Sequence, residues 1–419
     1  MTPLPPDPIR RNGGGATHAE LDRVVREHAG HLAAALVPLV GDFGAAEDLV
    51  QDAVVMALRR WPTEGIPDRP DAWLFTVARN RGLDQARRAT NYRAKLDQVA
   101  RLTPPSGADP DDRLRLIFTC CHPALSREVQ IALTLRVVCG LTTAQIARAF
   151  IVPETTVAQR ITRAKRKIAG AGIPYRTPDA DELGERLDEV LAVVYLLLNE
   201  GYLSTSAQAQ SRDLVDDAAW LAALLHRLMP TEPEVAGLLA LVRLHQARTD
   251  ARFDIDGRLV LLADQDRSLW DHTAIAEAGQ LIARAARQRR PGTYQLQAAI
   301  VAVHAEAPTW TDTDWEQIVL LYDMLLHLAP SPVTQLHRAI ALRYTAGPRA
   351  ALDAVAPLAD TLDHHHLFHA TRAELLRALG QPDQARTADQ RALTLTDNPA
   401  EQALLHTRLT WSDTPTPDP

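Results

Sequence analysis

Apolar residues recur at every third or fourth position along most of the 419-residue chain, the spacing that gives an α-helix one buried face. Aromatic residues make up only 5% of the chain, whereas Ala, Leu and Arg recur throughout, and this composition favours helices over sheets. The hydrophobic fraction of 46% is ordinary for a globular protein. We therefore expect an all-α protein with two or three domains, each with its own core.

Segments rich in helix breakers divide this pattern into parts. The stretch LTPPSGADPDD (102–112) holds three prolines and a glycine, and GIPYRTPDAD (172–181) is a second break. These breaks define the expected domains. They are a flexible N-terminus (1–15), a first helical domain (16–98), a linker (99–111), a second helical domain (112–172), a C-terminal helical domain (180–411) and a tail (412–419).

Charge is distributed unevenly between the front and the rear of the chain. Residues 1–176 hold 25 Lys and Arg against 18 Asp and Glu, whereas the remainder holds 20 against 34. The net charge of −7 therefore belongs to the rear. Because a basic surface attracts nucleic acid and an acidic one repels it, we expect the front part to bind DNA.

The cysteine content and the apolar runs indicate the compartment. Of the three cysteines, Cys120 and Cys121 are adjacent, which does not suit a disulfide framework and indicates a reducing environment. The N-terminus has no apolar core of signal-peptide length, and no apolar run in the chain reaches the roughly 18 residues of a membrane span. We expect a cytoplasmic protein that has no membrane partner.

The stretch LTTAQIARAFIVPETTVAQRITRAKRKI (141–168) predicts a helix-turn-helix. Thr142 and Gln145 have the spacing of a capping box at the start of the first helix. In the second helix Val157, Ile161 and Ala164 form a buried stripe, and five of the eight residues from 160 to 167 are basic. Such an outward face suits major-groove binding, whereas the simpler interpretation is a solvated basic helix. The candidate DNA-binding residues are Thr155, Thr156, Gln159, Arg160, Thr162, Arg163, Arg166 and Lys167.

Two helical segments upstream offer surfaces of different kinds. GDFGAAEDLVQDAVVMALRRW (41–61) has an acidic edge beside an apolar stripe, as expected for docking on another protein. PDAWLFTVARNRGLDQARRA (70–89) combines aromatic, Arg and Asn side chains, which can hold unpaired bases by stacking and hydrogen bonding. The alternative is that its aromatic residues belong to the core. The candidate residues of this second segment are Trp73, Phe75, Arg79, Asn80, Arg81, Arg87 and Arg88.

Together these motifs resemble the extracytoplasmic-function sigma factors of bacterial RNA polymerase, over residues 17–170. The family's A-E-D-L-V-Q-D-A-F-like helix is matched at 46–54, with Val54 where Phe is usual. Its W-L-x3-A-x-N-x3-D-x2-R-R segment is matched from Trp73 to Arg88. The rear half resembles the helical-repeat extension that one branch of the family carries.

The resemblance implies a role for each segment and two partners, core RNA polymerase and promoter DNA. On this resemblance we expect the segment from Trp73 to recognise and help to melt the −10 element, and the helix-turn-helix to read the −35 duplex. We expect the helix near residue 48 to bind the polymerase clamp. Its candidate contacts are Glu47, Asp48, Leu49, Gln51, Asp52 and Val54.

The turn of the helix-turn-helix departs from the family pattern. The family usually has Gly, an apolar residue and a Ser or Thr cap, whereas this chain has Ile151, Val152 and Pro153. A β-branched residue is disfavoured in a left-handed turn, and Pro153 has no side-chain oxygen for capping. The turn geometry, and with it the register of the second helix, is therefore open.

The rear half contains a repeat. Gly347 and Gly380 lie 33 residues apart, each between an apolar helix and an Ala- and Leu-rich helix. This spacing resembles a tetratricopeptide repeat. Because stacked helix pairs form surfaces that bind peptides or proteins, we expect a protein partner or an intramolecular contact with the front half, and a regulatory role. The alternative is an extension that only stabilises.

Three patterns that suggest metals have simpler interpretations. Cys120, Cys121 and His122 are adjacent and lack a second pair at zinc spacing, so buried thiols are expected. The run 363–366 with His369 is expected to be a solvated turn, and DIDG (254–257) lacks the remaining ligands of a calcium loop. No motif of a hydrolase, nucleotide-binding loop or dinucleotide fold occurs. We expect no cofactor and no enzymatic activity.

Two alternatives to the sigma factor remain. An ordinary helix-turn-helix regulator with a helical-repeat sensor domain would bind duplex DNA without polymerase. A scaffold would carry the helix-turn-helix pattern by accident, which the basic run at 160–167 argues against.

Overall fold

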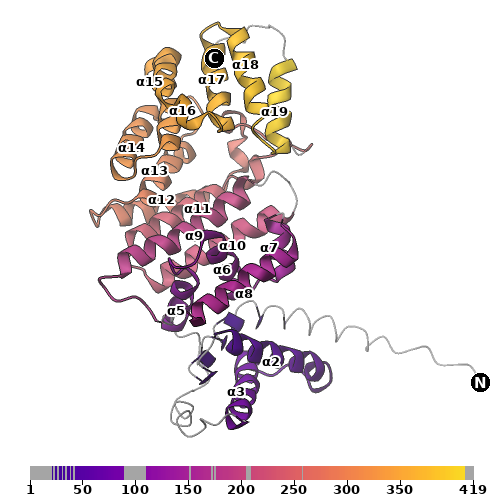
Figure 1. Ribbon diagram of the computed structural model, residues 1–419. Helices are drawn as coiled ribbons and strands as arrows, with labels where there is room; N and C mark the ends of the chain where they lie inside the picture. Colours follow the sequence, from indigo (N-terminus) through magenta and orange to yellow (C-terminus); the bar gives the residue numbers. More distant parts are fainter. Residues whose placement is uncertain are drawn as a thin grey trace, which may run out of the picture. The chain divides into compact units, whose positions relative to one another are not determined.

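The computed structural model describes residues 21–88, 110–203 and 209–410, apart from positions 22, 23, 26, 27, 31, 34, 38, 41, 42, 151, 171, 172, 174, 175 and 257. Regular structure in these residues is helical, and β-pairing is limited to an isolated bridge between Phe253 and Leu259 (Figure 1). The all-α expectation is confirmed. The chain forms two compact units, Met1–Leu196 and Leu197–Pro419. Among the described helices, none combines the length and apolar character needed to span a membrane.

The first unit begins with helical residues between 21 and 40, followed by α2 (Phe43–Glu64) and α3 (Pro70–Arg88). Apolar side chains spaced three or four residues apart on α2 and α3 meet in one core, in which Leu36, Leu49, Leu74 and Phe75 are each at most 1% exposed. Burial of these side chains fixes which faces of α2 and α3 remain exposed to solvent.

Four short helices follow, α5 (Pro110–Cys120), α6 (Arg127–Val137), α7 (Thr143–Ala149) and α8 (Glu154–Gly170). The capping box of α7 is formed in both directions. The Thr142 amide donates to Gln145 Oε1 at 2.8 Å, and the Gln145 amide donates to Thr142 Oγ1 at 3.1 Å. The predicted stripe of α8 is buried, with Val157 1%, Ile161 6% and Ala164 1% exposed.

Helix α9 (Leu183–Leu203) begins in the first unit and ends in the second. Its N-terminal half packs on α5 and α6 through polar contacts. Arg186 Nη2 donates to the Phe118 carbonyl at 2.6 Å, and Glu189 Oε2 forms an ion pair with Arg127 Nη1 at 2.9 Å. The chain after the 172–181 break therefore supports the helix-turn-helix domain through its first helix.

The second unit consists of helices joined by short connections. The connections include 3₁₀ turns at Thr249–Ala251, Leu262–Asp264, Arg267–Leu269 and Ala356–Leu358. Glu234 links two helices, because its carboxylate accepts hydrogen bonds from the amides of Tyr294 and Gln295 at the start of α13. The helices are α10 (Ala209–Leu228), α11 (Pro233–Gln246), α12 (His272–Ala286), α13 (Thr293–Glu306), α14 (Trp315–Leu328), α15 (Pro332–Val355), α16 (Ala359–Leu362), α17 (His366–Ala378), α18 (Pro382–Leu393) and α19 (Pro399–Thr410).

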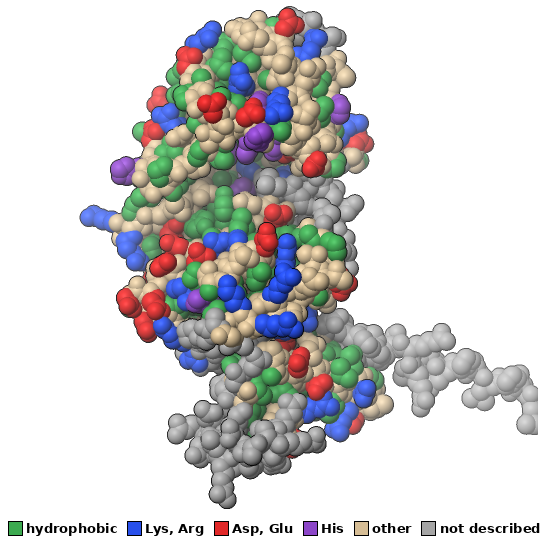
Figure 2. Space-filling view, viewed as in Figure 1, with side chains coloured by type: hydrophobic (Ala, Val, Ile, Leu, Met, Phe, Trp, Pro, Cys, Tyr) green, Lys and Arg blue, Asp and Glu red, His purple; other side chains and the backbone are tan. Residues whose placement is uncertain are grey.

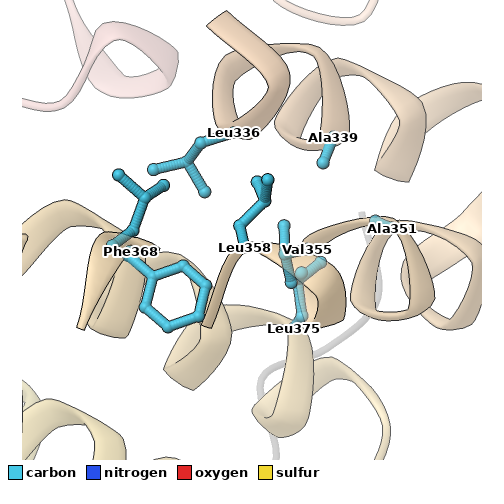
Figure 3. Packing of buried hydrophobic residues seen from close by; sticks show 8 residues of the cluster. Leu336, Ala339, Ala351, Val355, Leu358, Phe368 and Leu375 are labelled. Atoms are coloured by element: carbon cyan, nitrogen blue, oxygen red, sulfur yellow. The ribbon is translucent and has the colours of Figure 1, made fainter. Parts of the chain in front are cut away.

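The end of the second unit has the helix-pair packing that the repeat predicts. Gly347, which breaks α15, and Gly380, between α17 and α18, both have positive φ, 85° and 71°. Figure 3 shows Leu336, Leu358 and Phe368 converging in the core between α15 and α17. Small residues such as Ala373 and Ala385 lie between α17 and α18.

Candidate functional site

The outward face of α8 is polar and basic. Thr155, Gln159, Thr162, Arg163, Arg166 and Lys167 are exposed, and Thr156 and Arg160 are half-buried. In Figure 2, Lys and Arg side chains gather on the surface over α8. Because the apolar stripe of α8 is buried against the rest of the domain, these polar side chains share the opposite face. This arrangement can present hydrogen-bond donors to base edges and phosphates.

Several of these side chains have partners within the domain. Arg160 Nη2 lies 3.3 Å from Glu128 Oε2, and Lys167 Nζ donates to the Ala124 carbonyl. Thr162 Oγ1 donates to the Ala158 carbonyl one turn earlier, at 2.8 Å. Within the described part of the chain, the exposed side chains without such a partner are Thr155, Gln159, Arg163 and Arg166.

The connection between α7 and α8 is compact. The Val152 amide donates to the Ala147 carbonyl at 3.0 Å, and the carbonyl of Pro153 accepts from the Thr156 amide at 2.9 Å inside the first turn of α8. Of the described residues, Arg289 is the only non-glycine with positive φ, so Val152 and Pro153 are unstrained. The expectation of strain at Ile151 falls outside the described residues.

Helix α3 presents part of the predicted −10 set. Asn80 is exposed, and Trp73, Arg79 and Arg81 are half-buried. The rings of Trp73 and Trp61 meet edge to face at 5.5 Å between centroids. Arg87 and Arg88 lie at the end of α3, and their side chains fall outside the described part.

Two predicted contact residues require correction, because they lie in the core. Phe75 and Leu49 are each 1% exposed. Neither side chain can reach DNA or another protein while the domain is folded, and each instead fixes the packing of α2 against α3. The core interpretation of Phe75 is the correct one.

The remaining candidates on α2 form an edge. Asp48 and Asp52 are exposed, and Gln51 and Val54 are half-buried. Asp52 forms an ion pair with Arg81 of α3, with Oδ2 and Nη1 2.5 Å apart. The acidic edge therefore adjoins the α3 surface, and its two exposed carboxylates are Asp48 and Asp52.

Two parts of the first unit match families of known proteins. Residues 24–92 match sigma-70 region 2, and residues 115–168 match sigma-70 region 4. The chain is 33% identical over 165 residues to the ECF RNA polymerase sigma factor SigL of Mycobacterium tuberculosis, covering 38% of this chain and 93% of SigL. It belongs to the ECF sigma factors.

The similarity of this sigma factor to other proteins also extends beyond the two sigma regions. An uncharacterized protein of Rhizobium meliloti is 46% identical over 387 residues, covering 90% of this chain and 92% of the relative. The probable ECF sigma factor SigI of M. tuberculosis is 30% identical over 161 residues, covering 36% of this chain and 55% of SigI. Residues 186–286 match a family of unknown function, DUF6596. No solved structure matches the chain.

The sequence did not predict one contact between the two sigma regions. Glu47, expected to bind polymerase, is instead paired with region 4. Its Oε1 lies 3.6 Å from Arg136 Nε on α6, and its Oε2 lies 2.5 Å from Lys165 Nζ on α8. The basic character of Lys165 was evident from the sequence, but its partner Glu47 could not be predicted because it is distant in sequence.

The cysteines of region 4 are buried thiols, as expected. Cys120 is 2%, Cys121 1% and Cys139 2% exposed. Burial raises the pKa of Cys121 to about 12, although a hydrogen bond to Thr134 opposes the shift. Burial also raises the pKa of Cys120, so the Cys120 and Cys121 thiols are protonated and unreactive at neutral pH.

The histidine run differs from the expected solvated turn. His364 is exposed, but His369 is only 5% exposed and its Nε2 lies 2.7 Å from the Asp363 carbonyl. His366 Nε2 lies 3.1 Å from Glu401 Oε2. These contacts join α17 to its neighbours. Among the described residues, no three His, Cys, Asp or Glu side chains are arranged to hold a metal.

Proposed function

We propose that this chain binds core RNA polymerase and directs it to promoters of defined sequence. The observation that carries the proposal is the exposed face of α8, with Gln159, Arg163 and Arg166 opposite a buried stripe in region 4. The guanidinium groups of Arg163 and Arg166, with five N–H donors each, and the side-chain amide of Gln159 can form hydrogen bonds to base edges in the major groove of the −35 duplex. The chain acts as an initiation factor and itself catalyses no reaction.

The region 2 surface supports the other two contacts. Trp73 and Asn80 on α3 suit unpaired bases of the −10 element, by stacking and by hydrogen bonds to base edges. Arg79 and Arg81 add positive charge beside them. Asp48, Gln51, Asp52 and Val54 on α2 form the edge that docks on the polymerase.

Run-off transcription with purified core polymerase and candidate promoters tests the proposal. Transcripts that require both the full chain and a particular promoter support it. Duplex binding without transcription would support the helix-turn-helix regulator instead. If the chain neither binds the duplex nor supports transcription, the scaffold interpretation would be favoured.

The helical-repeat half regulates the sigma module in this proposal. Support comes from α9, whose Arg186 and Glu189 contact α5 and α6 of region 4, so that the start of the extension already bears on the promoter-reading domain. A change of state in the extension can therefore alter region 4.

Two truncations separate regulation from simple support. A chain ending after Leu203 keeps α9, whereas one ending after Arg176 removes it. If the repeats regulate, the longer truncation product changes promoter-specific transcription. If only the shorter one loses activity and stability, α9 supports the fold of region 4 and the repeats have no regulatory role.

A further inference from the structure

Two arginine side chains of the second unit lie against one buried indole ring. The centroid of the Trp270 ring is 4.5 Å from Arg267 Cζ and 5.8 Å from Arg248 Cζ. Trp270 is 3% exposed and Arg248 is 6% exposed. Arg248 follows the end of α11, whereas Arg267 and Trp270 lie in the connection between α11 and α12. Two cations are therefore held near each other in a place that is shielded from water.

The guanidinium of Arg267 is anchored on one side only. Its Nη1 donates to the His304 carbonyl at 2.7 Å and to the Ala307 carbonyl at 2.6 Å, both at the end of α13. Its Nη2 is buried and has no hydrogen-bond partner among the described residues. A buried guanidinium nitrogen without an acceptor is costly, because it has lost water and gained nothing in exchange. The fold therefore fixes Arg267 and leaves one nitrogen available to a ligand.

Three more buried polar atoms of this neighbourhood lack a hydrogen-bond partner among the described residues. They are Trp270 Nε1, His304 Nδ1 and Thr313 Oγ1. Thr313, which is 5% exposed, is linked to His304 through Trp310, whose carbonyl accepts from the Thr313 amide at 3.3 Å and whose ring stacks on the imidazole at 5.8 Å. Indole and hydroxyl groups donate hydrogen bonds, and a neutral imidazole donates from Nδ1 in one of its tautomers. The unpartnered atoms are thus donors, or can be.

The surroundings of these donors are positively charged. The Asp312 carboxylate acts on Arg267, but burial and the charge of Arg248 have larger effects, so the pKa of Arg267 is lowered. Asp312 Oδ2 instead accepts a hydrogen bond from Thr309 Oγ1 at 2.6 Å. Burial, with Arg248 and Arg267, also lowers the pKa of His304 to about 4. An anion is therefore attracted to this part of the second unit.

A water molecule can accept hydrogen bonds here but does not offset the charge, whereas an oxyanion does both. A phosphoryl group has three terminal oxygens and about 1.5–2 negative charges near pH 7, more of each than a carboxylate. We propose that Arg248, Arg267, Trp270, His304 and Thr313, the anion cluster, bind the phosphoryl group of a small ligand. Arg267 Nη2 donates the charged hydrogen bonds, and the neutral groups donate the others. The inference concerns the second unit alone and does not depend on the proposed function.

Aromatic rings beside the anion cluster suit the remainder of such a ligand. The rings of Trp310 and Trp315 meet edge to face with centroids 4.8 Å apart, and Tyr344 stacks on Trp315 at 3.9 Å. Tyr344 is 41% exposed. A planar group attached to the phosphoryl group can lie on these rings, whereas free phosphate makes no use of them. The two sources of the phosphoryl group therefore differ in the affinity they should show.

Isothermal titration calorimetry of the full chain, at constant ionic strength, tests the site with inorganic phosphate and with phenyl phosphate. Saturable binding of one equivalent is expected. Tighter binding of phenyl phosphate would identify a phosphate ester as the ligand, and binding of inorganic phosphate at least as tight would identify free phosphate. Acetate should bind at least about tenfold more weakly than either, because it has fewer oxygens and less charge.

Thr313→Val is the most informative variant, because it removes the hydroxyl with little change in volume. The hydroxyl has no partner within the described chain, so the melting temperature without ligand should stay the same or rise. Phosphate affinity should nevertheless fall about fivefold or more. Thr311→Val is the matched control, since Thr311 is exposed in the same loop and its hydroxyl already pairs with that of Thr309 at 2.8 Å. It should leave the affinity unchanged.

Arg267→Lys keeps a positive charge but lacks Nη2, and it should weaken phosphate binding about tenfold or more. Circular dichroism checks that each variant is folded, and Thr313→Val still decides the matter if Arg267→Lys does not fold. The proposal is overturned if neither phosphate compound binds saturably, if acetate binds as tightly, or if Thr313→Val retains full affinity. These titrations need no polymerase and no DNA, so their failure and that of the proposed function are separate results.

Discussion

Arg163 is an exposed residue of α8 with no partner among the described side chains, so its guanidinium is available to a base edge. Arg163→Ala should weaken binding to the −35 duplex by about 1–3 kcal/mol, with a much smaller effect on duplex of random sequence. Fluorescence anisotropy with both duplexes measures the difference. Arg349→Ala, at an exposed position in the repeat half, serves as the control and should change neither. An equal loss on both duplexes would mean that Arg163 touches only phosphate.

At single residues the sequence predicts the chemistry of a side chain better than its surroundings. The spacing of Val157, Ile161 and Ala164 predicted the buried stripe of α8, because helical periodicity is local. The prediction that Phe75 contacts DNA was wrong, because an aromatic side chain suits both base stacking and the core, and Phe75 lies in the core. The pairing of Glu47 with Lys165 could not be predicted, because it depends on how two domains meet.

The helices and their caps were predictable for the same local reason. The capping box at Thr142 is a three-residue pattern, and Gly347 and Gly380 mark turns that need positive φ. The position of α9 was not predictable. Its Arg186 and Glu189 look like ordinary surface charges, and their contacts with α5 and α6 are about 60 residues or more away in sequence.

The turn between α17 and α18 gives an element-scale prediction. Gly380 has a φ of 71°, and a Cβ added there would have nothing within 4 Å, so Gly380→Ala tests backbone strain alone. The substitution should destabilise the second unit by about 1 kcal/mol. Gly184→Ala, at an exposed helical position of α9 that is equally open, should be neutral or slightly stabilising. Thermal unfolding of both variants measures the contrast, and equal shifts would contradict the assignment.

At the scale of the whole molecule, the sigma regions and the remainder of the chain differ in charge. The sigma regions carry a basic excess and expose it on α8, whereas the acidic remainder forms a unit that would be repelled by DNA. That acidic unit nevertheless contains two histidines that are shielded from water and lie close to arginines. His245 on α11 and His304 on α13 lie near Arg248, and additional charge comes from Arg252 and Arg267. Its stability should therefore depend on pH.

Burial, reinforced by Arg248 and Arg252, lowers the pKa of His245 to about 3, and burial with Arg248 and Arg267 lowers that of His304 to about 4. Both rings are neutral in the folded chain. The unfolded histidines take up protons below about pH 6.5, so the stability that depends on neutral His245 is complete above that pH and is lost as pH falls toward about 3. Because the His245 side chain is only half-buried, we expect a loss of about 1–2 kcal/mol between pH 7 and pH 5.

Urea unfolding of the full chain at these two pH values, followed by tryptophan fluorescence, measures that loss. His245→Gln removes the titrating group and should reduce the difference between the two pH values, even if it lowers stability at both. His327→Gln, on the exposed face of α14, should leave the difference unchanged. If the His245 variant keeps the full pH dependence, the acid sensitivity of the second unit arises elsewhere, and His304→Gln becomes the variant that must reduce it.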